Sequence, residues 1–174
     1  ARGVIVCAGH TAADYARTRA ALVAGVRGFT HLYNAMSPLQ GREPGVVGAA
    51  LEDPDSWCGV IVDGHHVHPA SLRIALAAKP RGKIVLVTDA MPPVGADSDT
   101  YVLAGAKITC RDGRCGTADG VLAGSALDMA SGLSRWPTAP VPCRRTGALA
   151  SPTGSTATAS IRTTGGCRCA KRLL

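Results

Sequence analysis

Four short, mostly apolar runs, rich in β-branched residues, recur along the first half of the chain. They are GVIVCA at residues 3–8, GFTHLY at 28–33, WCGVIV at 57–62 and KIVLVT at 83–88. None of them shows the strict alternation of apolar and polar residues that a strand with one solvated face would have. Runs of this length and character predict strands that are buried on both faces, as in the sheets of α/β proteins.

Segments with helical spacing separate these runs. After Thr11, which can cap a helix, alanine, leucine and valine recur at helical intervals, and shorter helices are predicted at residues 46–51 and 69–78. Strands that alternate with helices predict an α/β fold with a parallel sheet.

Residues 101–122 break this alternation. The turn signals Asp112-Gly113 and Asp119-Gly120 lie among short β-prone stretches. They predict a β excursion, inserted after the fourth strand.

Side chains that can bind metals or transfer protons stand at the ends of the four runs. His10 follows the first run, His31 lies late in the second, Asp63 and His66 follow the third, and Asp89 ends the fourth. In parallel α/β folds the carboxyl ends of the strands meet at one edge, where ligand sites are built. A single histidine would more often be structural, but recurrence at four consecutive strand ends favours a functional site.

The charge divides the chain after about residue 133. Residues 1–133 carry twelve basic and twelve acidic residues, whereas residues 134–174 carry seven basic residues and no acidic one. The tail is rich in Arg, Pro, Thr, Ser, Ala and Gly and has no sustained periodicity. It predicts either a disordered basic arm or an out-of-frame product of a GC-rich gene, and the abrupt break favours the second. Nucleic acid is not favoured as a partner, because the tail lacks interleaved aromatic residues.

The seven cysteines show no zinc-binding spacing. Their odd number, without a signal peptide, argues against a disulfide framework, so we expect mostly reduced thiols and a cytoplasmic protein. No apolar run reaches the length that spans a membrane. The chain has no initiating Met and begins like the inside of a strand, so we expect a truncated N-terminus.

Five longer motifs stand out: AGHT at 8–11, THLYNAMSPLQGREPG at 30–45, DGHHVHP at 63–69, LVTDAMPPVG at 86–95 and DGVLAGSALDM at 119–129. Together they resemble the N-acetylglucosamine-6-phosphate deacetylases of the amidohydrolase superfamily, over about residues 1–133. The resemblance implies a (β/α)8 TIM-like barrel, of which this chain would hold about the last four strands. It also implies hydrolysis of the acetamido group of N-acetylglucosamine 6-phosphate to acetate and glucosamine 6-phosphate, in amino-sugar catabolism.

The same resemblance implies a metal site. His10 and His31 would be the imidazole ligands of a divalent ion, for which zinc is the first choice and iron or another divalent ion an alternative. A carboxylate ligand would lie on an earlier strand, ahead of Ala1, so the site would be incomplete in this chain. Asp89 would be the general base that activates water and then the acid that protonates the leaving amine.

Substrate contacts are implied as well. Arg42 would hold phosphate oxygens with its planar guanidinium group. The other implied contacts are Asn34, Ala35, Asp63, Gly64, His65, His66, Leu122, Ala123 and Gly124. Within DGHHVHP we expect His66 to be the contacting side chain and His68, beside Pro69, to lie at the start of a helix.

Two alternatives stay open at this point. The chain could be a non-catalytic binding protein that uses its basic tail, or another amidohydrolase that acts on a cyclic amide. Arg42, in a loop suited to phosphate, argues against the cyclic amide. Half a barrel would also leave open sheet edges, so we expect the chain alone to be unstable or prone to aggregation. A homodimer is compatible with the full-length parent.

Overall fold

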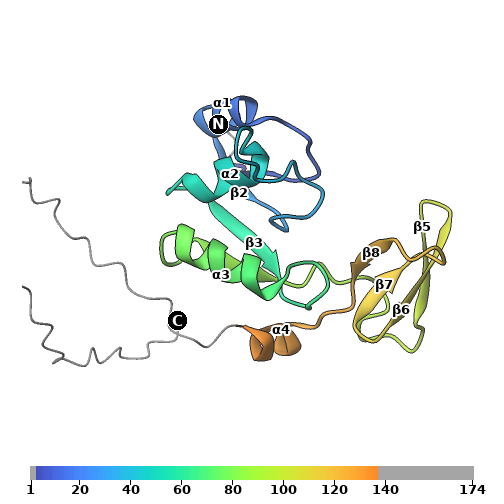
Figure 1. Ribbon diagram of the computed structural model, residues 1–174. Coiled ribbons are helices and arrows are strands. Elements are labelled where there is room, and N and C mark those ends of the chain that lie inside the picture. The colour runs from blue at the N-terminus through green and yellow to red at the C-terminus, as the bar shows by residue number, and fades with distance from the viewer. Residues whose placement is uncertain (1–2, 137–174) are drawn as a thin grey trace, which may run out of the picture. The chain divides into compact units, whose positions relative to one another are not determined.

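The structure, a computed structural model, describes residues 3–136 (Figure 1). Within this part the strands form two four-stranded sheets. The first is parallel, with the order β1 (Val6–Ala8), β2 (Val26–Phe29), β3 (Trp57–Ile61) and β4 (Ile84–Val87). The second is antiparallel, with the order β5 (Thr100–Leu103), β6 (Ala106–Arg111), β7 (Arg114–Gly116) and β8 (Leu122–Ser125).

Helices follow the first three strands in turn. They are α1 (Tyr15–Val23), α2 (Gly45–Glu52) and α3 (Pro69–Ala78), and α4 (Met129–Arg135) follows β8. The predicted α/β architecture is confirmed, and α3 has the bounds predicted for it. Consecutive parallel strands are what a (β/α)8 barrel requires, but a closed barrel stays a prediction. None of the helices in the described part is long and apolar enough to cross a membrane.

The main hydrophobic core lies between the parallel sheet and the helices. Its largest fully buried side chains include Phe29, Leu32, Val46, Val47 and Val60. The other face of the sheet is less covered, since Val6 is 52% exposed and Val85 is 40% exposed. The prediction of burial on both faces is therefore wrong at these two strands. The physical reason is that β1 and β4 are the edge strands of the sheet within the described residues.

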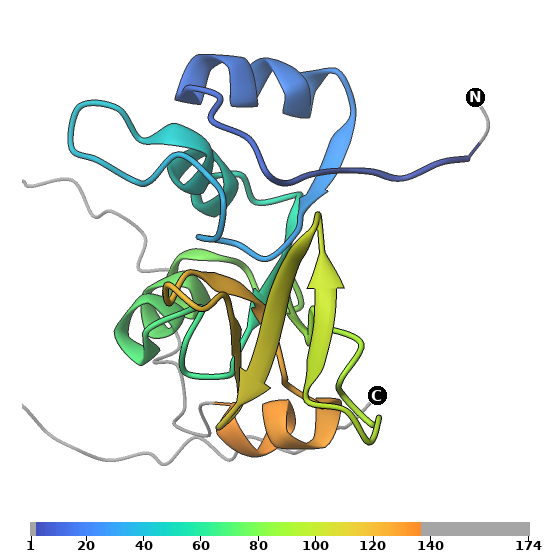
Figure 2. The same cartoon turned by 90° about the vertical axis from the view of Figure 1, so that its right-hand side faces the viewer.

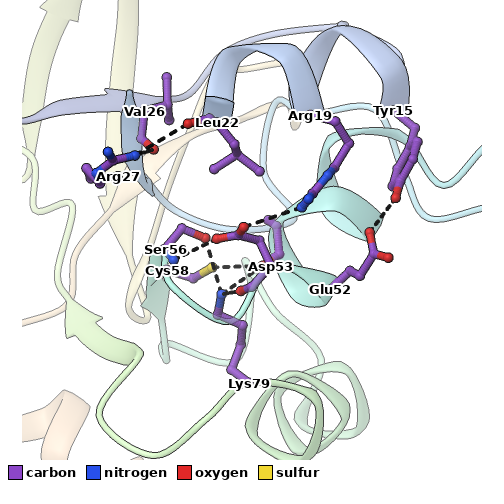
Figure 3. A network of polar contacts seen from close by, with 11 residues as sticks. Tyr15, Arg19, Leu22, Val26, Arg27, Glu52, Asp53, Ser56, Cys58 and Lys79 are labelled. Carbon is purple, nitrogen blue, oxygen red and sulfur yellow. Dashed lines mark hydrogen bonds and ion pairs between the residues drawn. The ribbon is translucent and has the colours of Figure 1, made fainter. Parts of the chain in front are cut away.

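A polar network ties the helices to the amino end of β3 (Figure 3). Lys79, at the end of α3, is only 5% exposed, and its ammonium group donates hydrogen bonds to the carbonyl oxygens of Ala50 and Asp53 and to the hydroxyl group of Ser56. Arg19 of α1 pairs with the Asp53 carboxylate at 3.3 Å. Burial lowers the pKa of Lys79. Because catalytic groups of such sheets gather at the opposite end of the strands, this network serves stability.

The antiparallel sheet confirms the predicted β excursion (Figure 2). Asp112 and Gly113 join β6 to β7 with φ angles of 53° and 79°, the left-handed values that a type I′ turn requires. Cys110 and Cys115 face each other across this hairpin and form a disulfide. The expectation of reduced thiols is therefore corrected for this pair. The hairpin register brings the two α-carbons within 3.9 Å, whereas Cys7 and Cys58 are free.

Helix α4 extends beyond residue 133, where the sequence predicted the end of the folded part and the start of the basic tail. Asp128 caps it by accepting a hydrogen bond from the backbone N–H of Ser131, and the helix ends at Arg135. Trp136 is half-buried against the main core. The rest of the predicted tail, residues 137–174, lies outside the described residues, so its irregular structure and out-of-frame origin stay predictions.

Candidate active site

Four of the predicted site positions lie at one edge of the parallel sheet. His10, His31, Asp63 and Asp89 each fall in the loop after one of the strands β1 to β4, and neighbouring parallel strands end on the same side. His10, His31 and Asp89 have φ angles of 45°, 30° and 50°. Such left-handed backbone is disfavoured for residues other than glycine and tends to cluster at functional sites. This strain is independent support for a site at this edge.

His10 and His31 are brought together. Their ring centroids are 4.7 Å apart, and the rings meet edge to face at 90°. Nδ1 of His31 lies 3.1 Å from the carbonyl oxygen of Asn34. Because a carbonyl oxygen only accepts, Nδ1 carries the hydrogen, which leaves the lone pair of a neutral imidazole on Nε2. His31 therefore presents the nitrogen that a metal ion would bind.

The backbone around this pair requires a small residue. The amide of Thr30 donates to the carbonyl oxygen of Ala8 at 2.9 Å, which draws the two strand ends together. A β-carbon at Gly9 would stand 2.0 Å from the hydroxyl oxygen of Thr30. A side chain there would have to displace the Thr30 hydroxyl group, so the glycine of the AGHT motif favours the close approach of the loops that carry His10 and His31.

The donor set fits a divalent metal only in part. Imidazole suits zinc and several other transition-metal ions. Within residues 3–136, however, no three His, Cys, Asp or Glu side chains are grouped closely enough to hold an ion. His10 and His31 can thus supply two ligands, and further ligands would have to come from outside the described residues.

Asn34 and Ala35 shape the loop beside His31. The Asn34 side-chain amide donates to the carbonyl oxygens of His31 and Leu32, each at 3.2 Å. Ala35 has a φ angle of 49°, and its carbonyl oxygen accepts a hydrogen bond from the backbone N–H of Thr11 at 2.9 Å. Asn34 therefore holds His31 in place, and Ala35 ties this loop to Thr11 in the loop after β1. Their predicted contact with substrate stays a prediction.

The GREPG loop is anchored by its acidic residue. The Glu43 carboxylate accepts hydrogen bonds from the backbone N–H groups of Tyr15 at 2.7 Å and Gly45 at 2.9 Å. Gly45 has a φ angle of 60°, and a β-carbon there would stand 2.8 Å from two carbonyl oxygens. Arg42 is exposed and has no polar partner among the described residues. The loop is therefore fixed while the guanidinium group remains accessible to an anion.

Asp63 organises the DGHHVHP loop. Its side chain is 2% exposed, and Oδ1 accepts hydrogen bonds from the backbone N–H groups of His65 at 2.8 Å and His66 at 2.9 Å. Oδ2 lies 2.6 Å from Nδ1 of His66. Burial by itself would raise the pKa of Asp63, but these hydrogen bonds outweigh it and lower the pKa to about 2. The carboxylate is thus engaged inside the loop, and Gly64 beside it has a φ angle of 85°.

The other two histidines of this loop differ in role. Nδ1 of His68 accepts a hydrogen bond from the backbone N–H of Ala70 at 3.1 Å, so His68 caps α3. This confirms the prediction of a residue at the start of a helix. His65 is exposed.

The segment Leu122, Ala123 and Gly124 belongs to β8 and borders the loop after β4. The carbonyl oxygen of Ser125 accepts a hydrogen bond from the backbone N–H of Met91 at 2.9 Å. A β-carbon at Gly124 would stand 2.3 Å from the Met91 side chain. This contact places β8 beside the residues that follow Asp89.

Two residues in contact with the site were not predicted. The Thr30 hydroxyl group lies 3.3 Å from Nε2 of His31, and the Arg135 guanidinium group donates to the carbonyl oxygen of Asp63. Thr30 precedes His31 in the THLYNAM motif, so the sequence could have indicated its contact with the site. Arg135 lies beyond the compositional break, and nothing in the sequence pointed to it.

Known proteins share sequence and fold with this chain. No family model matches the chain. The chain is 46% identical over 133 residues to an N-acetylgalactosamine-6-phosphate deacetylase of Shewanella sp. (strain ANA-3), which covers 76% of this chain and 34% of that protein. It is 40% identical over 144 residues to an N-acetylglucosamine-6-phosphate deacetylase of Vibrio furnissii, and the match covers 81% of this chain and 36% of that protein.

A solved deacetylase structure also resembles this chain in fold and in sequence. The crystal structure of N-acetylglucosamine-6-phosphate deacetylase from Pasteurella multocida matches with a TM-score of 0.72 and 42% identity, over 76% of this chain and 35% of that one. The chain thus spans about a third of the length of the curated relatives it matches. Sequence and fold together show that the chain belongs to the N-acetylglucosamine- and N-acetylgalactosamine-6-phosphate deacetylases.

Proposed function

We propose that the edge carrying His10, His31 and Asp89 is part of an active site that hydrolyses the acetamido group of an N-acetylated amino-sugar 6-phosphate. The products would be acetate and the free amino-sugar 6-phosphate, as in amino-sugar catabolism. The names of the relatives include both the glucosamine and the galactosamine compounds, so either epimer suits the proposal. The observation that carries it is the paired His10 and His31 rings, with Nδ1 of His31 held by a carbonyl oxygen.

His10 and His31 would hold a divalent metal ion, with zinc as the first choice. When bound, such an ion lowers the pKa of a coordinated water and polarises a carbonyl group. A third ligand would come from outside the described residues, and the four parallel strands would form part of a (β/α)8 barrel.

The chain's own residues would divide the remaining work. Asp89 would take a proton from the attacking water and return it to the nitrogen of the leaving amine. The exposed Arg42 guanidinium group would pair with phosphate oxygens. A cytoplasmic location is part of the proposal, because a phosphorylated sugar does not cross a membrane unaided.

A chimera gives the direct test. Residues 3–133 of this chain would replace the matching segment of a curated relative, and acetate release would be measured with both epimers. The chimera is expected to be active, and Asp89→Asn is expected to lower turnover by about 10²–10⁴-fold. Asp97→Asn, at an exposed aspartate of the loop before β5, is the matched control and should change little. An inactive but folded chimera, or full turnover with Asp89→Asn, would contradict the proposal.

A further inference from the structure

The Asp63 carboxylate was expected to contact substrate, but its geometry indicates another task. The side chain is 2% exposed, and both oxygens are occupied by His65 and His66. An ionised carboxylate with this many donors has little capacity left for a ligand. Its strongest single partner is the His66 ring, at 2.6 Å from Oδ2 to Nδ1.

The His66 ring is held with one nitrogen inward and the other outward. Nδ1 points at Asp63, and the side chain as a whole is 7% exposed. In the described part of the chain, no buried side-chain nitrogen or oxygen lacks a hydrogen-bond partner. Nε2 of His66 has no partner among the same residues, so this atom must belong to the exposed remainder of the ring. The loop places it at the carboxyl edge of β3, the strand that lies between β2 and β4.

Other charged groups near the pair leave this arrangement intact. Arg135 of α4 donates to the backbone carbonyl oxygen of Asp63, not to its carboxylate. Nε2 of His65 would stand 3.9 Å from a β-carbon at Gly113, so His65 faces the β6–β7 turn. Within the described residues, Asp63 and His66 therefore form a pair of their own.

We infer that Asp63 is a positioning residue, which fixes His66 with its proton on Nδ1 and presents Nε2 to the ligand. With Nδ1–H held by the carboxylate, Nε2 carries the lone pair of the neutral ring. Nε2 would then accept a hydrogen bond from a hydroxyl group of the ligand. That this ligand is an amino-sugar 6-phosphate rests on the proposed function.

The variant Asp63→Asn separates this task from simple loop stability. The Asn carbonyl oxygen can still accept the two backbone hydrogen bonds that Oδ1 accepts now. Its amide nitrogen would then face Nδ1 as a donor, so the neutral ring must carry its proton on Nε2 instead. The change therefore reverses the tautomer without removing the loop's backbone contacts.

The tautomer of His66 can be read from long-range nitrogen–proton correlation spectra of the nitrogen-labelled 174-residue chain. At about pH 9, where imidazoles are neutral, we expect the proton on Nδ1 in the parent and on Nε2 in Asp63→Asn. Asp128→Asn is the matched control, since Asp128 also caps backbone but has no histidine partner. The inference would be overturned if the His66 ring of the parent carried its proton on Nε2. This measurement on the parent does not depend on whether the variant folds.

Binding of glucosamine 6-phosphate gives the second readout, and inorganic phosphate is the comparison ligand without sugar hydroxyl groups. Asp63→Asn and His66→Ala should each weaken glucosamine 6-phosphate binding by about tenfold, because each removes the Nε2 acceptor, and the double variant should lose no more than His66→Ala alone. Additive losses would overturn the positioning role. If the parent binds neither compound while its tautomer is as inferred, the proposed function fails and the positioning role stands.

Discussion

The rings of His10 and His31 meet edge to face, with centroids 4.7 Å apart, although the two residues follow different strands. Three local features produce this meeting: parallel pairing of β1 with β2, the absence of a side chain at Gly9, and left-handed backbone at both histidines. The left-handed backbone at the two histidines costs free energy, which the surrounding contacts must offset. The backbone at this edge of the sheet therefore imposes the close approach of the two rings.

Metal binding should depend on both members of the pair. His10→Ala or His31→Ala is expected to weaken Zn²⁺ binding by about tenfold or more, since each removes one of the two imidazole ligands. Titration calorimetry on the 174-residue chain, after alkylation of its free thiols, measures this. His68→Ala is the control, because His68 caps α3. Unchanged affinity in either of the first two variants would exclude that residue as a ligand.

The stability of the fold should fall in acid through Asp63. Its pKa is about 2 in the folded chain, against an ordinary value of 3.8, so the fold favours the ionised form. This stabilisation is fully present above the ordinary pKa and is lost as the pH falls toward the folded value. It amounts to about 2 kcal/mol. The variant Asp63→Asn should lack this stabilisation, because an amide side chain does not ionise.

Urea unfolding of the parent and of Asp63→Asn measures this difference. The gap in the free energy of unfolding between the two should be widest at neutral pH and should narrow by about 2 kcal/mol as the pH approaches 2. Asp97→Asn, at an exposed carboxylate, provides the reference. A gap that stays constant with pH would refute the role given to the ionised carboxylate.

Local signals predicted much of this fold. The apolar runs located β3 and β4 within a residue or two, Pro69 marked the start of α3, and the Asp112-Gly113 pair predicted its turn. In each case the residue type itself restricts the backbone. The parallel sheet followed because strands and helices alternate. The shared edge of His10, His31 and Asp89 then followed from the parallel order.

Features that depend on register or on three-dimensional neighbours could not be predicted in this way. The Cys110–Cys115 disulfide depends on the β6–β7 register, which the count of cysteines does not contain. The family resemblance implied a substrate contact for Asp63, but whether its oxygens face a ligand or His65 and His66 depends on the loop conformation. Exposure of Val6 and Val85 depends on which strands are edges.

Gly124 should tolerate no side chain. Its φ angle is 134°, and a β-carbon would stand 2.3 Å from the Met91 side chain, so Gly124→Ala adds both backbone strain and overpacking. We expect a loss of about 2–4 kcal/mol in the free energy of unfolding. Met91→Ala in the same chain should recover the overpacking part only. Gly105→Ala, at a φ of 83° with open space around it, isolates the backbone part. Equal losses in Gly124→Ala and Gly105→Ala would contradict the packing role.

Lys79 should stabilise the fold without affecting the chemistry. Lys79→Met keeps most of the aliphatic volume but leaves the carbonyl oxygens of Ala50 and Asp53 without their buried donor (Figure 3). Each unsatisfied group costs about 1–3 kcal/mol, so urea unfolding should show a loss of several kcal/mol. Lys107→Met, at an exposed lysine of β6, should change stability by less than about 0.5 kcal/mol.

Lys79→Met also tests whether the amino end of the sheet affects metal binding at the carboxyl end. Because the Lys79 network surrounds the amino end of β3, Zn²⁺ affinity at His10 and His31 should be unchanged in the folded fraction of Lys79→Met. The measurement is made well below the unfolding midpoint of the variant. A weaker metal affinity there would mean that the network and the histidine pair are energetically coupled through β3, and that the amino end contributes to the site as well as to stability.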